Sequence, residues 1–308
     1  MKGKTILITG AAGFLGSHLA EKLAEENRVI AVDIANNLPQ DIKESLKFYE
    51  VDIADPDIIA EVFRKERPQT VYHLAGPISL RREIDDPLFK KSLNILGNLS
   101  TILNCCTKYE AEKIIFFSSG GAIYEEARTI PTPENYPAHP ASLYGLANLI
   151  IERYIKSYQQ KYGLSFTFLR FGNVYGPRQW ENGIIPSIII KVLKGESPVI
   201  YGKGNQTRDF IFVEDAIEAS IIALNDNRNE TYNVSSGKEI SINKILDKVT
   251  VILNKQVKPI YASRKNKETE RSCLDNSKIK KELGWQPKIN IDQGLRKTAD
   301  WLKLKYDR

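Results

Sequence analysis

The chain has 308 residues, of which 42% are hydrophobic and 27% charged, the balance of a soluble globular protein with one large domain or two coupled ones. No apolar run approaches roughly 18 residues, which excludes a membrane-spanning helix. The net charge of +6 is modest and its 44 Lys and Arg residues are spread along the chain, so an anionic small substrate is favoured over nucleic acid.

Neither the cysteines nor the histidines have the spacing of a metal site or a disulfide framework. Cys105 and Cys106 are adjacent in an apolar helical run, and Cys273 stands alone. The N-terminus leads directly into an apolar strand at residues 5–8, without a charged leader or a cleavage site. We therefore expect a cytoplasmic protein with reduced cysteines and no bound metal.

Over the first two-thirds of the chain, short apolar runs alternate with amphipathic runs. The predicted strands are 4–9, 28–33, 46–51, 70–74, 113–118 and 165–170. The predicted helices between them are 14–26, 56–66, 88–108 and 142–162. This alternation predicts an α/β fold with a parallel sheet that is covered by helices on both faces.

After about residue 173 the segments become shorter and richer in Gly and Pro. The helices predicted there are 184–194, 214–225, 242–253, 276–283 and 291–304. We expect a first domain over residues 1–173 and a smaller mixed lobe over residues 174–308, with some segments of the lobe returning to the first domain.

A glycine-rich turn follows the first predicted strand and opens a helix at Phe14 and Leu15. Gly10 permits a tight turn, Gly13 lets the backbone approach a pyrophosphate, and Gly16 lets the helix pack close to the strand. The helix N-terminus offers N–H groups to phosphate. Asp33 ends the second strand, where a carboxylate bonds the adenine ribose and favours NAD over NADP. These features predict a Rossmann-type, doubly wound sheet that binds NAD.

The order of its motifs gives the chain a resemblance to the extended short-chain dehydrogenase/reductases, and among these to nucleotide-sugar epimerases and dehydratases such as UDP-glucose 4-epimerases. The matching segments are Gly10 to Gly16, Asp52-Ile53, His73-Leu74-Ala75, Ser118 to Tyr124, Tyr144 to Asn148, Phe171 to Arg178, Tyr201 to Phe210 and Leu283-Gly284-Trp285. The resemblance implies contacts with the cofactor from Asp52, Ile53, Leu74, Ala75, Gly76 and Ser118. It extends over essentially the whole chain, and residues 174–308 then become the substrate-binding lobe.

The resemblance implies that Tyr144 takes a proton from a sugar hydroxyl while hydride moves to NAD. The family has a lysine four residues after this tyrosine, but here the position holds Asn148. A unit charge about 4 Å from the phenol, at an effective dielectric constant of about 20, would stabilise the phenolate by at most roughly 4 kcal/mol. Asn148 can bond the cofactor ribose but carries no charge, and Arg153 and Lys156 lie too far along the helix to replace the lysine.

Asn148 leaves three interpretations open: a slowed but competent enzyme, a cofactor-binding protein that has lost catalysis, or a sequence altered at this position. For the hydroxyl that bonds the sugar, the position common in the family holds Gly120, so we select its neighbour Ser119. Gly120 and Gly121 stand where dehydratases of the family carry two acids, which disfavours dehydration.

On the substrate side, the resemblance assigns the diphosphate to Asn173 and Arg208, and an Arg fork suits phosphate oxygens. A further basic position of the family falls on Lys265, with Arg264 as the alternative. Arg81, with Arg82 beside it, follows the fourth strand and either contacts the substrate or faces water.

The residue that lines the sugar 2-position corresponds to Ser272, three before Asp275. Its small size predicts that N-acetylated sugars are tolerated. A shift of the alignment by one residue would put Arg271 or Cys273 at this position instead.

The helices over 88–108 and 142–162 carry apolar stripes. These stripes either pair with their copies in a four-helix bundle, as in dimers of the family, or are buried within one chain; we expect a homodimer. The expected function is NAD-dependent epimerisation of a UDP-sugar, most simply UDP-glucose or UDP-N-acetylglucosamine at C4. The alternatives are a nucleotide-sugar reductase or decarboxylase, and a non-catalytic protein that binds NAD and a nucleotide sugar.

Overall fold

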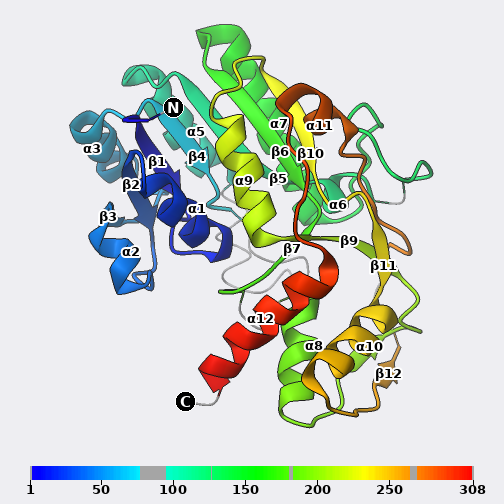
Figure 1. Ribbon diagram of the computed structural model, residues 1–308. Coiled ribbons are helices and arrows are strands. Elements are labelled where there is room, and N and C mark those ends of the chain that lie inside the picture. Colours follow the sequence, from blue (N-terminus) through cyan, green and yellow to red (C-terminus); the bar gives the residue numbers. More distant parts are fainter. Residues whose placement is uncertain (1, 77–94, 126, 180–182, 264–268, 307–308) are drawn as a thin grey trace. The chain divides into compact units, whose positions relative to one another are not determined.

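The computed structural model describes residues 2–76, 95–125, 127–179, 183–263 and 269–306 (Figure 1). The chain divides into two compact units. The first comprises residues 1–123, 140–170 and 220–232, and the second comprises residues 124–139, 171–219 and 233–308. The chain therefore passes between the units several times.

The first unit is built on a seven-stranded sheet with the order β10-β6-β5-β4-β1-β2-β3. Its strands are β1 (Thr5–Thr9), β2 (Arg28–Asp33), β3 (Lys47–Glu50), β4 (Thr70–His73), β5 (Lys113–Ser119), β6 (Ser165–Phe171) and β10 (Glu230–Val234). The neighbours β3, β2, β1, β4 and β5 pair in parallel. The predicted doubly wound, Rossmann-type parallel sheet is thus confirmed.

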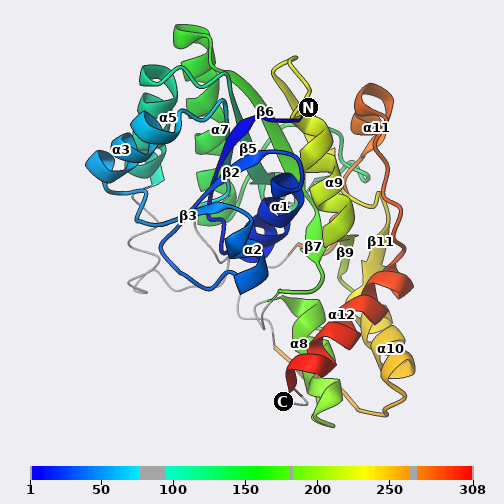
Figure 2. The same ribbon diagram turned by 60° about the vertical axis from the view of Figure 1, so that its left-hand side comes forward.

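Helices cover both faces of this sheet, as Figures 1 and 2 show. The helices are α1 (Phe14–Ala24), α2 (Gln40–Glu44), α3 (Pro56–Glu66), α5 (Ile95–Lys108), α6 (Gly120–Ile123) and α7 (Leu143–Tyr162). One apolar core joins the sheet to α3, α5 and α7 through buried side chains such as Leu7, Phe63, Ile102 and Ile155. Strands buried on both faces explain the nearly continuous apolar runs in the sequence.

The second unit holds two small sheets and a group of helices. Its strands are β7 (Asn173–Tyr175), β8 (Val199–Tyr201), β9 (Thr207–Phe212), β11 (Glu239–Ser241) and β12 (Ile260–Ala262), in the orders β11-β9-β7 and β12-β8. Its helices are α8 (Ile184–Leu193), α10 (Ile242–Leu253), α11 (Ser277–Leu283) and α12 (Ile291–Tyr306). Helix α9 (Val213–Ala223) belongs to the second unit up to residue 219 and to the first unit from residue 220. The three-stranded sheet is mixed, since β9 is antiparallel to β11 and parallel to β7.

Most predicted elements are present with ends shifted by one or two residues. The helix predicted at 142–162 is α7, which begins at Leu143 because the Ser142 hydroxyl accepts from the Gly145 N–H, and ends at the left-handed Gly163. The helix predicted at 88–108 is described from Ile95, and its first part lies outside the described residues. The sequence did not predict α6, because two glycines disfavour a helix there.

Among the helices that the structure describes, none is long and apolar enough to cross a membrane.

Candidate functional site

The turn between β1 and α1 is closed by glycine contacts. Gly10 has a φ of +72°, and a Cβ there would lie 2.9 Å from the Ala75 nitrogen. A Cβ on Gly16 would lie 2.1 Å from the Gly10 carbonyl oxygen, while Gly13 caps α1 without a side-chain hydrogen bond. The turn therefore requires glycine at both ends, and the first turn of α1 carries no acid that would repel a phosphate.

Asp33 is held against this glycine turn at the end of β2. Its Oδ2 accepts from the Ala12 N–H at 2.9 Å, and its Oδ1 accepts from the Ala35 N–H at 3.0 Å. A carboxylate has about four acceptor positions, so it can still bond hydroxyl groups. Asp52 is exposed and accepts from the Ala54 N–H, and Ile53 beside it is buried.

The end of β4 is fixed by a buried threonine. The Thr9 hydroxyl accepts from the Leu74 and Ala75 N–H groups at 3.3 and 3.2 Å, and it lies 2.9 Å from His73 Nδ1. Burial lowers the pKa of His73 to about 4, so the imidazole is neutral at pH 7. This network places Leu74 and Ala75 beside Gly10 and leads into Gly76, where a Cβ would meet no atom within 4 Å.

Tyr144, Asn148 and Ser119 come together at the start of α7. Burial raises the pKa of the Tyr144 phenol, and this outweighs the lowering of the pKa by hydrogen bonding with the Asn148 and Ser119 side chains. The buried Asn148 turns its Nδ2 back to donate to the Tyr144 carbonyl at 2.8 Å. The site thus has a tyrosine in reach of a hydroxyl and an amide, and the groups that act on the phenol carry no positive charge in the part of the chain that the structure describes.

A glycine lets α7 approach the end of β5 closely enough for this arrangement. A Cβ on Gly145 would lie 2.2 Å from the Ala122 carbonyl oxygen and 2.9 Å from Pro140 Cβ. Gly145 directly follows Tyr144, and Ala122 belongs to α6, the turn that follows Ser119. Gly145 therefore serves close packing beside the tyrosine.

Behind this site lies a buried ion pair. Glu152 Oε1 accepts from the Ser118 hydroxyl at 2.7 Å and from Arg170 Nε at 2.8 Å, while Arg170 Nη2 donates to the other oxygen at 2.5 Å. The Glu152 and Arg170 side chains are 1% and 8% exposed. Glu152 lies one helical turn after Asn148 on α7, so the pair ties the face of the helix that carries the tyrosine to β5 and β6.

In the second unit, Asn173 and Arg208 lie on neighbouring strands, with Asn173 opposite Phe210 in the parallel pair β7 and β9. Asn173 is exposed. Arg208 Nη1 donates to the carbonyls of Thr207 and Thr269, both at 2.8 Å. These bonds hold one terminal nitrogen of the guanidinium group against the backbone at residues 207 and 269.

The region of Ser272 distinguishes the three candidate positions. Ser272 is partly exposed, whereas Cys273 is buried and its Sγ lies 3.5 Å from Asp209 Oδ2. Arg271 makes a two-fold ion pair with Glu239, through Nε and Nη2, both at 3.0 Å. Of the three, Ser272 is therefore the small side chain that is neither buried against Asp209 nor held in an ion pair. Arg81, Arg82, Arg264 and Lys265 lie outside the described residues.

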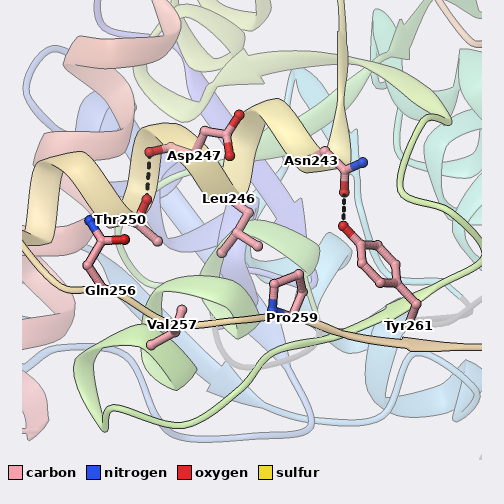
Figure 3. Close-up of a pocket in the computed structure, with 8 residues that line it drawn as sticks. All are labelled: Asn243, Leu246, Asp247, Thr250, Gln256, Val257, Pro259 and Tyr261. Atoms are coloured by element: carbon pink, nitrogen blue, oxygen red, sulfur yellow. Dashed lines mark hydrogen bonds between the residues drawn. The ribbon is translucent and has the colours of Figure 1, made fainter.

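A hollow of about 190 Å³ lies elsewhere in the second unit, beside α10 (Figure 3). The Tyr261 hydroxyl bonds Asn243 Oδ1 at 3.1 Å across its rim, and Thr250 donates to the Asp247 carbonyl at 2.8 Å. It contains none of the site residues predicted from the sequence.

Sequence reasoning missed the polar groups that support the site. Thr9, Glu152 and Asp209 are buried and hydrogen-bonded. Thr9 and Glu152 belong to none of the matching segments, and Asp209 lies in the segment from Tyr201 to Phe210 without a role of its own. One signal was available for Glu152: it continues the spacing of four residues from Tyr144 through Asn148 on one helix face.

Comparisons with known proteins agree with this fold. A model of the NAD dependent epimerase/dehydratase family matches residues 6–235. A putative UDP-glucose 4-epimerase of Methanocaldococcus jannaschii is 39% identical over 97% of this chain and 98% of its own length.

Two solved structures are similar over nearly the whole fold. The UDP-glucose 4-epimerase of Thermotoga maritima with UDP-glucose has a TM-score of 0.93, is 34% identical, and is matched over 98% of this chain and 99% of its own. The UDP-N-acetylglucosamine 4-epimerase of Methanobrevibacter ruminantium in complex with UDP-N-acetylmuramic acid has a TM-score of 0.90, is 31% identical, and is matched over 99% and 100%.

We predict that Glu152→Gln destabilises the protein by about 3–5 kcal/mol, because it leaves the Arg170 charge buried without its partner. The measurement is the free energy of unfolding in urea. The control is Glu61→Gln, which breaks an exposed pair with Arg64 and should change the free energy of unfolding far less. Equal losses in the two variants would contradict a structural role for the buried pair.

Proposed function

This chain belongs to the NAD dependent epimerase/dehydratase family, and we propose that it inverts C4 of a UDP-sugar by transient oxidation. NAD is its cofactor, as the family description states. The observation that carries the proposal is the meeting of Tyr144, Ser119 and Asn148 at the start of α7. Proton transfer from a sugar hydroxyl requires a positioned acid–base group, which Tyr144 supplies, and the Ser119 hydroxyl beside it can orient the sugar.

The residues around β1, β2 and β4 suit NAD. We assign the pyrophosphate to the turn from Gly10 to Gly16, including the N–H groups at Phe14 and Leu15, and the adenine ribose to Asp33. The further cofactor contacts in the proposal are Asp52, Ile53, Leu74, Ala75, Gly76 and Ser118. When bound, NAD supplies the acceptor and the donor of hydride.

Tyr144 takes the proton from the C4 hydroxyl as a phenolate and returns it after the keto sugar has turned over. Ser119 bonds the same hydroxyl and keeps it directed at the phenol oxygen. Asn148 bonds the nicotinamide ribose but adds no charge. Because burial raises the pKa of Tyr144, the phenolate is a small fraction at pH 7 and the proposed enzyme is slow.

The substrate proposal rests on the second unit. Asn173 and Arg208 bind the diphosphate, with Lys265 or Arg264 and Arg81 as further predicted contacts. The small, partly exposed Ser272 leaves room for an N-acetyl group. UDP-glucose and UDP-N-acetylglucosamine are therefore both proposed, and the two similar structures described above carry epimerase names for these two sugars.

One observation favours a second function. The Asn148 amide is bonded to its own helix, and no lysine stands in its place. A protein that binds NAD and a nucleotide sugar without converting it would retain every other feature of the site. NMR of UDP-galactose and UDP-N-acetylgalactosamine with NAD separates the two functions: the epimerase forms the epimer, whereas the binding protein forms it only as Asn148→Lys.

We predict that turnover by the native protein rises with pH through the alkaline range, since the phenol must lose its proton to act. Asn148→Lys places a positive charge near the phenolate, lowers the pKa of Tyr144 and shifts the profile of kcat to lower pH by about 1–3 units. The measurement is kcat between pH 6 and 10. Asn148→Gln adds length without charge, so it should not shift the profile; a shared profile for both variants would contradict the electrostatic explanation.

We also propose a homodimer through α5 and α7. These helices are joined by bonds from Ser100 to the Tyr154 hydroxyl at 3.0 Å and from the Tyr158 hydroxyl to Asn104 at 2.7 Å. The outer face of α7 exposes apolar side chains, and an apolar hollow of about 400 Å³ lies on it. The exposed apolar side chains are those of Leu143, Leu146 and Ile150. The hollow is lined by Leu149, Ile150, Arg153, Tyr154 and Ser157. A second copy of the helix would cover this face.

We predict that Ile150→Asp converts the dimer into a monomer, because the exposed apolar face could pair only by burying the new charge. Ile150 is 38% exposed in the single chain. The measurement is molar mass by light scattering after size-exclusion chromatography. Ile58→Asp on α3, at 43% exposure, is the control and should remain dimeric. A native protein that is already monomeric would refute the proposed interface.

A further inference from the structure

Asp209 is a buried carboxylate that accepts five hydrogen bonds in the second unit. Its Oδ1 accepts from the Ser236 N–H at 2.8 Å and from the Ser236 hydroxyl at 2.6 Å. Its Oδ2 accepts from the N–H groups of Gly237 and Leu274 at 3.1 and 3.2 Å and from the Cys273 thiol at 3.5 Å. The residue is 1% exposed. Its hydrogen bonds thus come from two separate loops, at 235–237 and 273–274.

Three of the segments that adjoin Asp209 continue into proposed substrate residues. Arg208 precedes it on β9, and Ser272 precedes the Cys273 that donates to it. On a third side, a Cβ on Gly172 would lie 3.0 Å from the Asp209 carbonyl oxygen and 3.7 Å from its Cγ. Gly172 immediately precedes Asn173. Asp209 is therefore next to Arg208 in the chain, bonded to the residue after Ser272 and close to the residue before Asn173.

The chemistry of the partners explains why this position holds an acid. All five partners of the carboxylate are donors, and a carboxylate is the side chain that only accepts. An amide of the same shape would turn its NH2 group toward at least one backbone N–H. That N–H would then be buried without an acceptor, and its loop would move away. Ser235 adds a second connection between the loops, because its hydroxyl donates to the Leu274 carbonyl at 3.1 Å.

We propose that Asp209 is a positioning residue for the nucleotide diphosphate and the sugar, since it holds the segments of Asn173, Arg208 and Ser272 in one arrangement. The inference rests on the proposed function, which assigns these three residues to the substrate. Asp209 itself does not touch the substrate. Its effect is on affinity for the UDP-sugar and not on proton transfer, which belongs to Tyr144 in the first unit.

The test is Asp209→Asn in the full chain. We expect the Kd for UDP and the KM for the UDP-sugar to rise about tenfold, which is about 1.4 kcal/mol of binding free energy. The Kd for NAD and kcat should change by less than about twofold. Calorimetric titration with UDP and with NAD, and initial rates, give these quantities. If Asp209→Asn does not fold, the variant Ser236→Ala with Cys273→Ala removes two donors and should weaken UDP binding in the same direction.

The matched control is Asp215→Asn. Asp215 is 2% exposed and accepts from the Lys288 and Ile289 N–H groups, both at 3.0 Å, so it is equally buried but adjoins no proposed substrate residue. It should lose stability and keep the native Kd for UDP. An equal rise in Kd for both variants, or no rise for Asp209→Asn, overturns the inference.

Arg208→Ala separates this inference from the proposed function. If Arg208→Ala weakens UDP binding while Asp209→Asn does not, the positioning role alone is wrong. If Arg208→Ala leaves UDP binding unchanged, the assignment of the substrate site is wrong and the inference falls with it.

Discussion

The candidate catalytic site depends on the buried ion pair between Glu152 and Arg170. The Glu152 carboxylate is the point where α7, β5 and β6 meet, because it bonds Ser118 at the end of β5 and Arg170 on β6. Desolvation of two charges makes such a pair costly to bury, and its geometry is correspondingly strict. Asn148 and Tyr144 lie one and two helical turns before Glu152, so the rotation of α7 that satisfies the pair also directs Tyr144 toward Ser119.

The same pair positions Tyr144 without supplying a positive charge to its phenol. The charge of Arg170 is neutralised by Glu152, and Arg170 is not among the groups that act on the phenol. Lys156, one helical turn after Glu152 on α7, lies over the Phe166 and Phe168 rings of β6 and does not act on the Tyr144 phenol either. The described part of the chain thus positions Tyr144 well and leaves its phenolate without positive charge. Bound NAD would add the positive charge of its nicotinamide ring.

Local patterns in the sequence were sufficient to predict the sheet, most helices and the glycine turn. The reason is that apolar periodicity and the spacing of Gly10, Gly13 and Gly16 act over a few residues. Two kinds of feature could not be predicted without knowledge of the fold. Partners such as Glu152 and Arg170 are 18 residues apart and meet only after α7 has packed on β6. The direction of the Asn148 amide, back to its own helix, depends on burial that no motif describes.

Each unit contains a buried carboxylate beside proposed site residues, and the two are compensated in different ways. Glu152 is neutralised by a cation, so the cost of burying its charge is offset mainly by one strong partner with a long side chain. Asp209 is compensated by five donors, of which three are backbone N–H groups. The interactions that offset the cost of burying its carboxylate are therefore distributed over the chain segments that it joins. Burial raises the pKa of Asp209 more than these hydrogen bonds lower it. A cation partner suits a helix that must keep one orientation on a sheet, whereas backbone donors suit loops whose main-chain positions must be set.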